Sequence, residues 1–465
     1  MSIKNILFIL SMNSPDNYGK ILLKRDFWKA EIMKFYQKLA LCGAAVLATV
    51  GLSACSNNKS NSSSSTKIPT KISKKTNVTF WYSLTGTSQS ALKKLTTDFE
   101  KKNPNITIKL QSQGGNYSDL QSKLVSGLQS PKDLPTITQA YPGWLYNAAK
   151  NKMLVNLTPY VNNKSIGWGS YKNSGIKKAL WDGAKINGTQ VGVPFNKSVE
   201  VLFYNKTLLD KYNVKVPTNM SELASASAKI YRESHHKVRG VGFDALNNYY
   251  MMQMKETYGK DFNKNLSFAA NDSVKAINYY AEGVKAGYFM QAGTEKYMST
   301  PFNNGRVAMF IGSTANEAYL KQGLKKGYTY GVAARPSTMN VQQGTDIYMF
   351  KKASAMQKAA AFKYLKFLTS KSSQLYWAKQ TGYMPVNTAA LTDTEYQKAK
   401  DSKIPAVLAK TSKNLYFLPV TKNSITAYDQ VNANMQTILA KASKKQNWNS
   451  DIRVGKQKLD AAWKQ

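Results

Sequence analysis

The stretch Val78-Thr79-Phe80-Trp81-Tyr82 is rich in β-branched and aromatic residues and predicts a β-strand. Residues 90–101 then place apolar side chains at helical spacing, and residues 106–110 alternate apolar and polar side chains as a second strand does. A helix over 119–128 and a third strand over 134–139 continue the alternation. A chain that alternates strand and helix in this way builds an α/β lobe around a largely parallel sheet.

A second unit of the same kind follows further along the chain. The first pattern breaks near Gly192-Val193-Pro194-Phe195-Asn196. Beyond it, residues 199–204 predict a strand, residues 206–212 a short helix, Met220 the start of a longer helix, and residues 238–243 another strand. The 465 residues are enough for two lobes of ordinary size, each with its own core.

The last third of the chain shifts from strands to helices. Residues 304–313 predict a turn, a buried strand and a loop of small residues, and residues 331–336 predict a segment that crosses between the two units. Residues 347–350 favour a strand and residues 357–368 a helix. From Asp393 to the end, helical patterns dominate.

The N-terminal region has the parts of a secretory signal. An apolar run ends at Leu52-Ser53-Ala54-Cys55, and Lys34 and Lys38 precede it. The run of about 14 residues is shorter than the roughly 20 that a spanning helix needs. This segment resembles a bacterial lipoprotein signal, which implies cleavage before Cys55 and lipid attachment to its sulfur. A non-lipidated signal, or a chance cysteine beside an apolar helix, is the alternative.

Two further features surround that signal. Met33 begins a segment that is a complete signal start by itself, so Met33 is a candidate for the real start; a genuinely long signal is the alternative. Residues 56–75 are rich in Ser, Asn and Lys and predict a flexible tether. We therefore expect a signal peptide over 1–54 and a lipidated Cys55 with its tether over 55–76.

The composition limits the classes of function. With 65 basic and 26 acidic residues the net charge is +39, which favours anionic surroundings such as cell-wall polymers, acidic lipid or an anionic solute. The lysines are spread along the chain with no nucleic-acid motif, so we expect no nucleic-acid partner. Of the two cysteines, Cys42 lies inside the signal, which leaves no disulfide or cysteine metal site in the folded part.

The sequence also lacks the residues of common enzymes and cofactor sites. His235 and His236, the two histidines, are adjacent and would point about 100° apart on a helix, so they do not form a metal pair. The chain has no nucleophile elbow and no phosphate-binding Gly-Lys-Ser loop. We therefore expect no enzymatic activity, no cofactor and no metal.

Six segments in order carry a family resemblance. They are Val78-Thr-Phe-Trp-Tyr-Ser, Phe99-Glu-Lys-Lys-Asn-Pro-Asn-Ile, Val193-Pro-Phe-Asn-Lys-Ser, Leu202-Phe-Tyr-Asn-Lys, Gly305-Arg-Val-Ala-Met and Thr381-Gly-Tyr-Met-Pro-Val. The chain from about Asn77 to Gln465 resembles the extracellular solute-binding proteins of ABC importers, the maltose-binding-like group. The resemblance implies the two-lobed, type II periplasmic-binding-protein fold of the α/β class, with the ligand cleft between the lobes. It implies one lobe from 77–193 plus about 333–392, and the other from 194–332 plus about 393–465.

Within that group the chain resembles the binders of glycerol 3-phosphate and glycerophosphodiesters. Their Gly-Asn-Tyr loop, Pro-Phe-Asn-Ser-Ser segment, Ser-rich loop, Gly-rich loop and Gly-Tyr-Leu-Pro segment have counterparts here. The resemblance implies that the cleft is lined by Tyr117, Ser198, Ser313, Gly344 and Tyr383.

Two positions depart from that subfamily. The glutamate that holds glycerol hydroxyls is replaced by Pro142, and the late arginine that clamps phosphate is replaced by Asn432. An arginine fork binds phosphate in a bidentate way that asparagine cannot reproduce. Either Lys197 or Lys422 supplies the charge from another place, or the solute is not a phosphate.

Aromatic and polar side chains complete the set of candidates. A flat ring stacks on the C–H groups of a sugar or polyol while its polar edge forms hydrogen bonds. The aromatic candidates are Trp81, Tyr82, Tyr117, Tyr141, Trp144 and Tyr383. Asp346 is a candidate acceptor for sugar hydroxyls and Lys197 a candidate anion contact; ordinary structural roles are the alternative for all of them.

These observations predict a lipid-anchored, monomeric solute-binding subunit on the outer face of the cell membrane. The resemblance implies that it delivers its solute to a membrane permease that a separate ATPase drives. Glycerol 3-phosphate or a glycerophosphodiester is the expected solute, and a neutral sugar or oligosaccharide is the alternative. A third possibility is a surface lipoprotein that binds cell-wall polymer.

Overall fold

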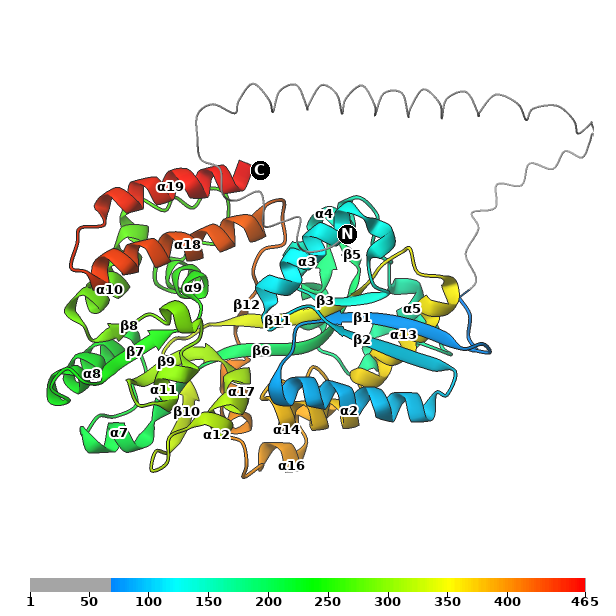
Figure 1. Ribbon diagram of the computed structural model, residues 1–465, viewed down its shortest axis with the longest axis horizontal. Helices are drawn as coiled ribbons and strands as arrows, with labels where there is room; N and C mark the ends of the chain where they lie inside the picture. The colour runs from blue at the N-terminus through cyan, green and yellow to red at the C-terminus, as the bar shows by residue number, and fades with distance from the viewer. Residues whose placement is uncertain (1–67, 465) are drawn as a thin grey trace, which may run out of the picture. The chain divides into compact units, whose positions relative to one another are not determined.

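The computed structural model describes residues 68–464 (Figure 1). Cys55, the signal segment and most of the tether lie outside the described residues. Within the described chain, the fold is a layered α/β structure built on a long sheet with helices on both of its faces (Figure 1). The strands are β1 Thr76–Tyr82, β2 Ile106–Ser112, β3 Ile137–Ala140, β4 Lys185–Ile186, β5 Thr189–Gln190, β6 Gly192–Asn205, β7 Arg239–Phe243, β8 Phe289–Met290, β9 Val307–Ser313, β10 Tyr330–Ala334, β11 Asn340–Met349 and β12 Leu415–Tyr416.

The first half of the sheet has the strand order β2-β1-β3-β11-β6. β1 pairs in parallel with β2 and β3, as the alternation of strand and helix predicts. β11 runs antiparallel to both β3 and β6. The strands of this half bury Val78, Phe80 and Ile137, because their side chains face the covering helices.

The second half continues from the same long strand. β6 pairs over its second part with β9 and β10, both antiparallel, and β7 lies between β9 and β8. β6 and β11 therefore run side by side and join the two halves of the molecule (Figure 1). The fold has two lobes. The strands that pass between them, β6 and β11, form the base of the gap between the lobes.

Two sequence predictions about these connections are wrong. The expected break at 192–196 lies inside the continuous strand β6. Pro194 stands opposite Asp346, where the register between β6 and β11 shifts. At such a shift the strand pairing needs no N–H donor, so a proline is tolerated. The expected crossing at 331–336 is mostly β10, a strand that pairs with β6. The chain returns instead through β11, and the strand predicted over 347–350 covers only the end of it.

Helices cover the sheet, and the segments in 78–139 and 199–243 have the structure that their patterns predict, except that the third strand, expected over 134–139, is β3 at Ile137–Ala140. The helices are α2 Gly86–Lys102, α3 Tyr117–Gln129, α4 Tyr146–Lys150, α5 Thr158–Asn162, α6 Lys178–Gly183, α7 Lys206–Lys211, α8 Met220–Glu233, α9 Leu246–Tyr258, α10 Asn271–Ala286, α11 Ser299–Asn303, α12 Glu317–Gly323, α13 Ala355–Leu368, α14 Lys371–Thr381, α15 Thr388–Leu391, α16 Thr394–Gln397, α17 Ile404–Thr411, α18 Ser424–Ser443 and α19 Asn449–Lys464.

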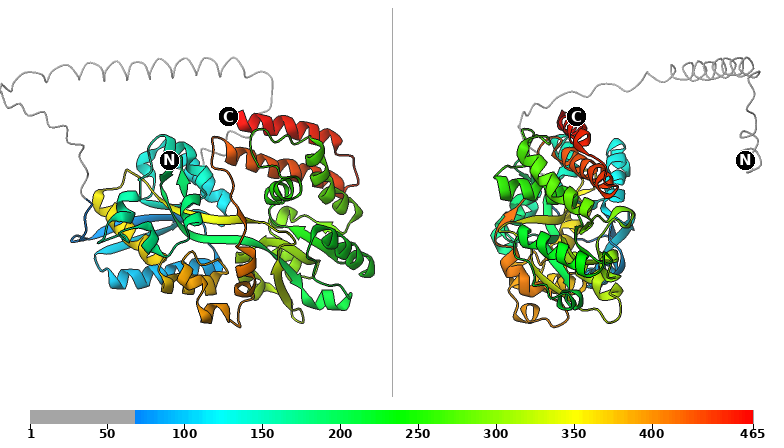
Figure 2. Two further views of the ribbon diagram at one scale, coloured as in Figure 1. Left: turned by 180° about the vertical axis from the view of Figure 1, so that it is seen from behind. Right: turned by 90° about the vertical axis from the view of Figure 1, so that its left-hand side faces the viewer.

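The molecule has two large apolar cores, and the first extends from the first lobe into the second as far as Phe203 and Phe310. In the first lobe, α13 packs on β1 and α14 packs on α2, around Phe80, Phe99 and Tyr364. In the second lobe, α18 packs against α9, α10 and α19 (Figure 2). It buries Val431 and Met435. The chain therefore returns to the second lobe at its C-terminal end, and α18 borders the gap between the lobes.

Candidate functional site

Two adjoining cavities lie between the lobes, above β6 and β11. The larger has a volume of about 820 Å³ and the smaller about 400 Å³. Both fall within the range of about 300–1,000 Å³ that is typical of small-molecule sites. Residues from both lobes line the junction of the two cavities: Tyr117, Tyr141, Asp244, Ala245, Tyr297, Gln343 and Gly344. We call the two cavities together the cleft.

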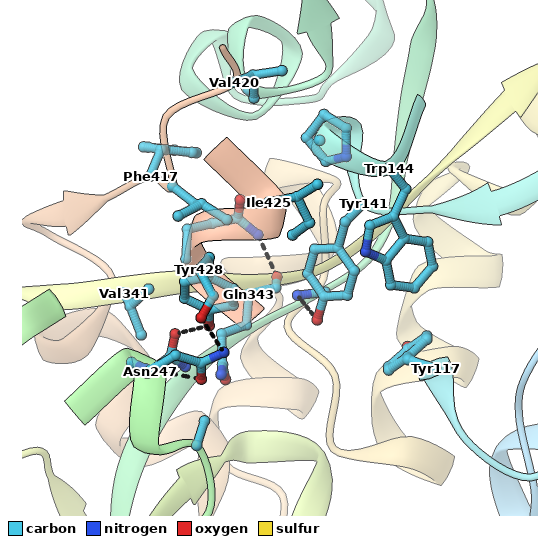
Figure 3. A pocket seen from close by; sticks show the side chains of 18 of the residues that line it. Tyr117, Tyr141, Trp144, Asn247, Val341, Gln343, Phe417, Val420, Ile425 and Tyr428 are labelled. Atoms are coloured by element: carbon cyan, nitrogen blue, oxygen red, sulfur yellow. Dashed lines mark hydrogen bonds between the residues drawn. The ribbon is translucent and has the colours of Figure 1, made fainter. Parts of the chain in front are cut away.

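The first-lobe wall of the larger cavity is aromatic. Tyr117 begins α3, and Tyr141 and Trp144 belong to the turn that follows β3. The ring centroids of Tyr141 and Trp144 are 5.1 Å apart, and those of Tyr117 and Tyr141 are 5.6 Å apart, both edge to face. Figure 3 shows the three rings on one side of the cavity. We call these three residues the aromatic wall; such a surface suits the apolar face of a sugar or polyol.

Hydrogen bonds behind that wall fix Tyr117. Its hydroxyl lies 3.0 Å from the hydroxyl of Tyr383 and accepts a hydrogen bond of 2.8 Å from Asn196 Nδ2. The Asn196 side-chain oxygen Oδ1 in turn accepts from Thr345 Oγ1 at 2.6 Å. Burial raises the pKa of Tyr117 well above its usual value, so its hydroxyl keeps its proton at physiological pH.

A buried ion pair forms the floor of the cleft. Lys197 on β6 and Asp346 on β11 are joined by a contact of 2.6 Å between Nζ and Oδ1, and their side chains are 2% and 0% exposed. Lys197 also donates to the Gly344 carbonyl at 3.3 Å. Gly344 has a φ of +88°, and a Cβ there would lie 2.0 Å from the Asn196 carbonyl oxygen, so only glycine fits this bend. Burial raises the pKa of Asp346, and the charge of Lys197 opposes that rise.

The second-lobe wall is built from amides, a hydroxyl and a carboxylate. It comprises Asp244, Asn247, Asn248 and Tyr428, and we call it the polar wall. Tyr428 on α18 donates to the Asn248 side-chain oxygen, and Asn248 Nδ2 donates to Glu200 at 2.9 Å. Figure 3 shows Asn247 and Tyr428 facing the cavity across from Tyr141.

A second buried ion pair supports the polar wall from below. Arg335 Nε lies 3.2 Å from Glu200 Oε2, and both side chains are buried. Arg335 also contacts Glu256 on α9 at 3.3 Å. Burial raises the pKa of Glu200, while Arg335 and the Asn248 hydrogen bond lower it. The polar wall is thus held by a continuous chain of polar contacts that ends at a paired charge.

The structure places most of the sequence-predicted site residues on the cleft. Five line the smaller cavity: Tyr117, Ser198, Ser313, Gly344 and Tyr383. Trp144 and Lys197 line the larger cavity, although Lys197 is held by Asp346. Asp346 itself is fully buried and is not among the residues that line either cavity.

Some of the remaining candidates line the cleft and others lie away from it. Pro142 and Asn432, the two departures from the subfamily, both line the larger cavity. Trp81 lines a separate hollow, and Tyr82 is buried beneath the first lobe's surface. Lys422 is exposed and is not among the residues that line either cavity.

Sequence reasoning missed the polar wall. Asp244 directly follows β7, and the carboxyl end of a strand in a parallel pair is where α/β proteins commonly place ligand contacts. The position of Asp244 directly after this strand could therefore have marked it as a candidate ligand contact from the sequence. Asn247 and Asn248 lie in the first turn of α9, and Tyr428 lies inside α18, where nothing in the local sequence separates it from a packing tyrosine.

Within 68–464, no group of three or more His, Cys, Asp or Glu side chains is close enough to hold a metal ion. In the same part of the chain, no helix combines the length and the apolar character that crossing a bilayer requires.

Comparison with known proteins gives the family. The model of the family described as bacterial extracellular solute-binding protein matches residues 94–406, and the chain belongs to this family. The chain is 25% identical to the sn-glycerol-3-phosphate-binding periplasmic protein UgpB of Salmonella typhimurium, over 75% of this chain and 83% of that protein. It is 22% identical to the multiple sugar-binding protein of Streptococcus mutans, over 85% of this chain and 88% of that protein.

Solved structures show the same fold. UgpB of Mycobacterium tuberculosis in complex with glycerophosphocholine aligns with a TM-score of 0.72 at 19% identity, over 83% of this chain and 98% of that one. An ABC substrate-binding protein of Listeria monocytogenes in complex with cycloalternan aligns equally well, with a TM-score of 0.72 at 20% identity, over 83% and 99%. The expected type II two-lobed fold is therefore confirmed, and the chain is the solute-binding component of an ABC importer.

Proposed function

We propose that this protein binds an uncharged sugar or oligosaccharide and delivers it to an ABC permease. The observation that carries the proposal is the charge of the cleft. Among the described residues that line the two cavities, the basic side chains are Lys185 and Lys197. Lys185 pairs with Asp182 and Lys197 with Asp346, each at 2.6 Å. A phosphate would find both cations already neutralised.

The rest of the lining fits the same solute. Asp244 and Asp429 add carboxylates to the larger cavity, and these repel an anion but accept hydrogen bonds from hydroxyl groups. Asn432, at the position of the subfamily's arginine, offers an amide rather than a fixed positive charge. An aromatic wall opposite an amide-rich wall is the combination that a polyhydroxylated ring requires.

A glycerophosphodiester is the second candidate. It is supported by the similarity to the two UgpB proteins, whose names state glycerol 3-phosphate or glycerophosphocholine, and by the five subfamily positions on the smaller cavity. A diester carries one negative charge, which the smaller cavity would have to hold with hydroxyls and backbone N–H groups. Glycerol 3-phosphate is a phosphate monoester and carries more negative charge than a diester, so it would be still harder to hold with hydroxyls and backbone N–H groups alone.

Isothermal titration calorimetry of the purified protein tests this choice. The panel is maltotriose, glycerophosphocholine and glycerol 3-phosphate, measured also with Asn432→Arg. We expect heat from maltotriose and none from the two phosphates, and we expect the arginine variant to gain affinity for a phosphate. Binding of a phosphate to the wild-type protein, without binding of maltotriose, would reverse the order of the two candidates.

We also propose the anchor, the location and the lobe boundaries. Cys55, after signal cleavage, would hold the protein as a monomer on the outer face of the cell membrane, beside its permease. The lobes would comprise 77–193 plus about 333–392, and 194–332 plus about 393–465. Growth with a labelled fatty acid tests the anchor, because the label should follow the wild-type protein and be absent from Cys55→Ala. Label on the variant would place the lipid elsewhere.

A further inference from the structure

The carboxylate of Asp244 stands where the two cavities meet. It directly follows β7 and lines both cavities. Its Oδ1 accepts a hydrogen bond of 2.6 Å from the Met298 backbone N–H, and its Oδ2 accepts one of 2.7 Å from Asn316 Nδ2. The packing on its other side is tight, since a Cβ on Gly312 would lie 2.3 Å from Oδ2.

Each of those two donors belongs to a different segment of the cleft wall. Met298 follows Tyr297, whose side chain lines both cavities and is 48% exposed. Asn316 ends a short turn that begins at Ser313, a residue of the smaller cavity, and its amide also donates to the Ser313 carbonyl at 3.2 Å. One carboxylate therefore ties together the end of β7, the segment of Tyr297 and the turn of Ser313.

Tyr297 lies on an irregular segment that is also held by the Arg306–Glu295 ion pair and by the fully buried Met298 side chain. The preceding residue, Lys296, has a φ of +64°, a left-handed conformation that is unfavourable for a lysine. The two short helices around it, Gly293–Glu295 and α11, have three and five residues. The hydrogen bond from Met298 to Asp244 is the constraint that links this irregular backbone, and with it the Tyr297 ring, to the end of β7.

We propose that Asp244 is a specificity-determining residue that receives a solute hydroxyl at the junction of the cavities and positions Tyr297 as the divider between them. Each carboxylate oxygen already accepts one hydrogen bond and has a second lone pair for a solute O–H. The solute contact rests on the proposed function, because it requires a hydroxyl donor. The positioning of Tyr297 does not, and it can be tested on the free protein.

The positioning contact should respond to pH. Burial raises the pKa of Asp244 to about 7, with opposing contributions from the Met298 and Asn316 hydrogen bonds. The titratable groups that face Asp244 are Glu200 on β6, Tyr280 on α10 and Tyr297 on the segment before α11. None of these three groups is a cation. A protonated carboxyl loses one acceptor oxygen, so one of the two tethers weakens as the pH falls below 7.

Amide hydrogen exchange of the full-length protein tests the positioning role, with protection factors corrected for the intrinsic effect of pH. At pH 8 we expect the Met298 amide to be about tenfold more protected in the wild-type protein than in Asp244→Asn, because a charged acceptor becomes a neutral one. At pH 5.5 the wild-type value should fall toward that of the variant, and the variant itself should not change. Asp182→Asn, a cleft carboxylate on the other lobe, is the matched control and should leave Met298 unchanged.

Equal protection of Met298 in wild type and Asp244→Asn at pH 8 would overturn the positioning role. If Asp244→Asn does not fold, as judged by protection of the β1 amides, the wild-type comparison between pH 8 and pH 5.5 decides. A Met298 protection factor that is the same at both pH values would then refute the proposal.

Calorimetry with maltotriose tests the solute contact. We expect Asp244→Asn to bind at least about tenfold more weakly at pH 8, since it loses a charged acceptor. Equal affinity would refute the contact. If the wild-type protein does not bind maltotriose, glycerophosphocholine becomes the probe. If it binds neither, the solute contact is refuted together with the proposed function. The hydrogen-exchange result still decides the positioning role.

Discussion

The two walls of the cleft differ in the kind of contact that they offer. The aromatic wall of the first lobe presents Tyr117, Tyr141 and Trp144, which remove apolar surface from water but form few directional bonds. The polar wall of the second lobe presents amides, a hydroxyl and a carboxylate, which fix orientation. The first wall offers mainly stacking and the second mainly hydrogen bonds, so a solute gains its full contact only when both lobes reach it. The cleft chemistry itself therefore favours closure of the lobes.

The largest expected effect comes from breaking the floor on which both walls stand. Lys197→Met should lower the free energy of unfolding by about 3–5 kcal/mol, because it leaves Asp346 as an unpaired buried charge. Urea denaturation measures this loss. Lys197→Met combined with Asp346→Leu should recover most of it, because the pair is then replaced by apolar groups.

The control for that change is a pair of the same type on the surface. Lys206 and Asp210 are also 2.6 Å apart, but both are exposed, and Lys206→Met should leave the denaturation midpoint unchanged. If Lys197→Met were equally neutral, the floor would owe its stability to the β6–β11 ladder rather than to the ion pair.

The aromatic wall can be tested separately from the fold. Trp144→Ala should weaken solute binding about tenfold or more, because large aromatic contacts in a desolvated site dominate binding energy. Titration calorimetry with the best solute of the panel measures it. Tyr376→Ala, a half-buried ring on α14 away from both cavities, is the matched control and should bind normally. Normal binding by Trp144→Ala would mean that the solute sits in the smaller cavity alone.

The polar wall should show a smaller loss. Tyr428→Phe removes the donor to the Asn248 side-chain oxygen and leaves that oxygen without its partner. We expect a loss of about 1 kcal/mol, or about fivefold in affinity, since a single neutral hydrogen bond is affected. The same titration measures it, with Tyr258→Phe on α9 as the control, since that ring does not line the cavities. A larger loss than for Trp144→Ala would invert the ranking of the two walls.

The sequence predicted the aromatic wall better than the polar wall, and the reason is physical. Tyr117 and Gly344 belong to loops whose local composition and family resemblance mark them, and Gly344 has a backbone angle that only glycine adopts easily. Tyr428 lies inside a long helix of a chain with 28 tyrosines, where periodicity indicates burial but not what the hydroxyl contacts. Residues whose role depends on packing between distant helices leave no local pattern.

The same limit applies to the fold. The repeating strands and helices of the first lobe are encoded locally and were predicted correctly. Pro194 was misinterpreted as a break. A proline inside a strand is tolerated beside a bulge, and this bulge exists only through the pairing of β6 with β11, whose register shifts between Thr345 and Asp346. The pairing of Lys197 with Asp346 was missed for the same reason: it depends on how β6 and β11 align.

The smallest expected effect concerns an exposed contact between the two lobes at the edge of the larger cavity. Gln121 on α3 donates to Asp429 on α18 at 3.3 Å, in an exposed position. Gln121→Ala should weaken solute binding by about twofold or less, because water replaces an exposed hydrogen bond at little cost. Gln121→Glu should weaken binding further, since it places two carboxylates opposite each other in the closed form, and added salt should reduce that extra loss. If Gln121→Glu binds as tightly as Gln121→Ala at low salt, the two side chains do not face each other when solute is bound, and closure brings the walls together through the solute alone.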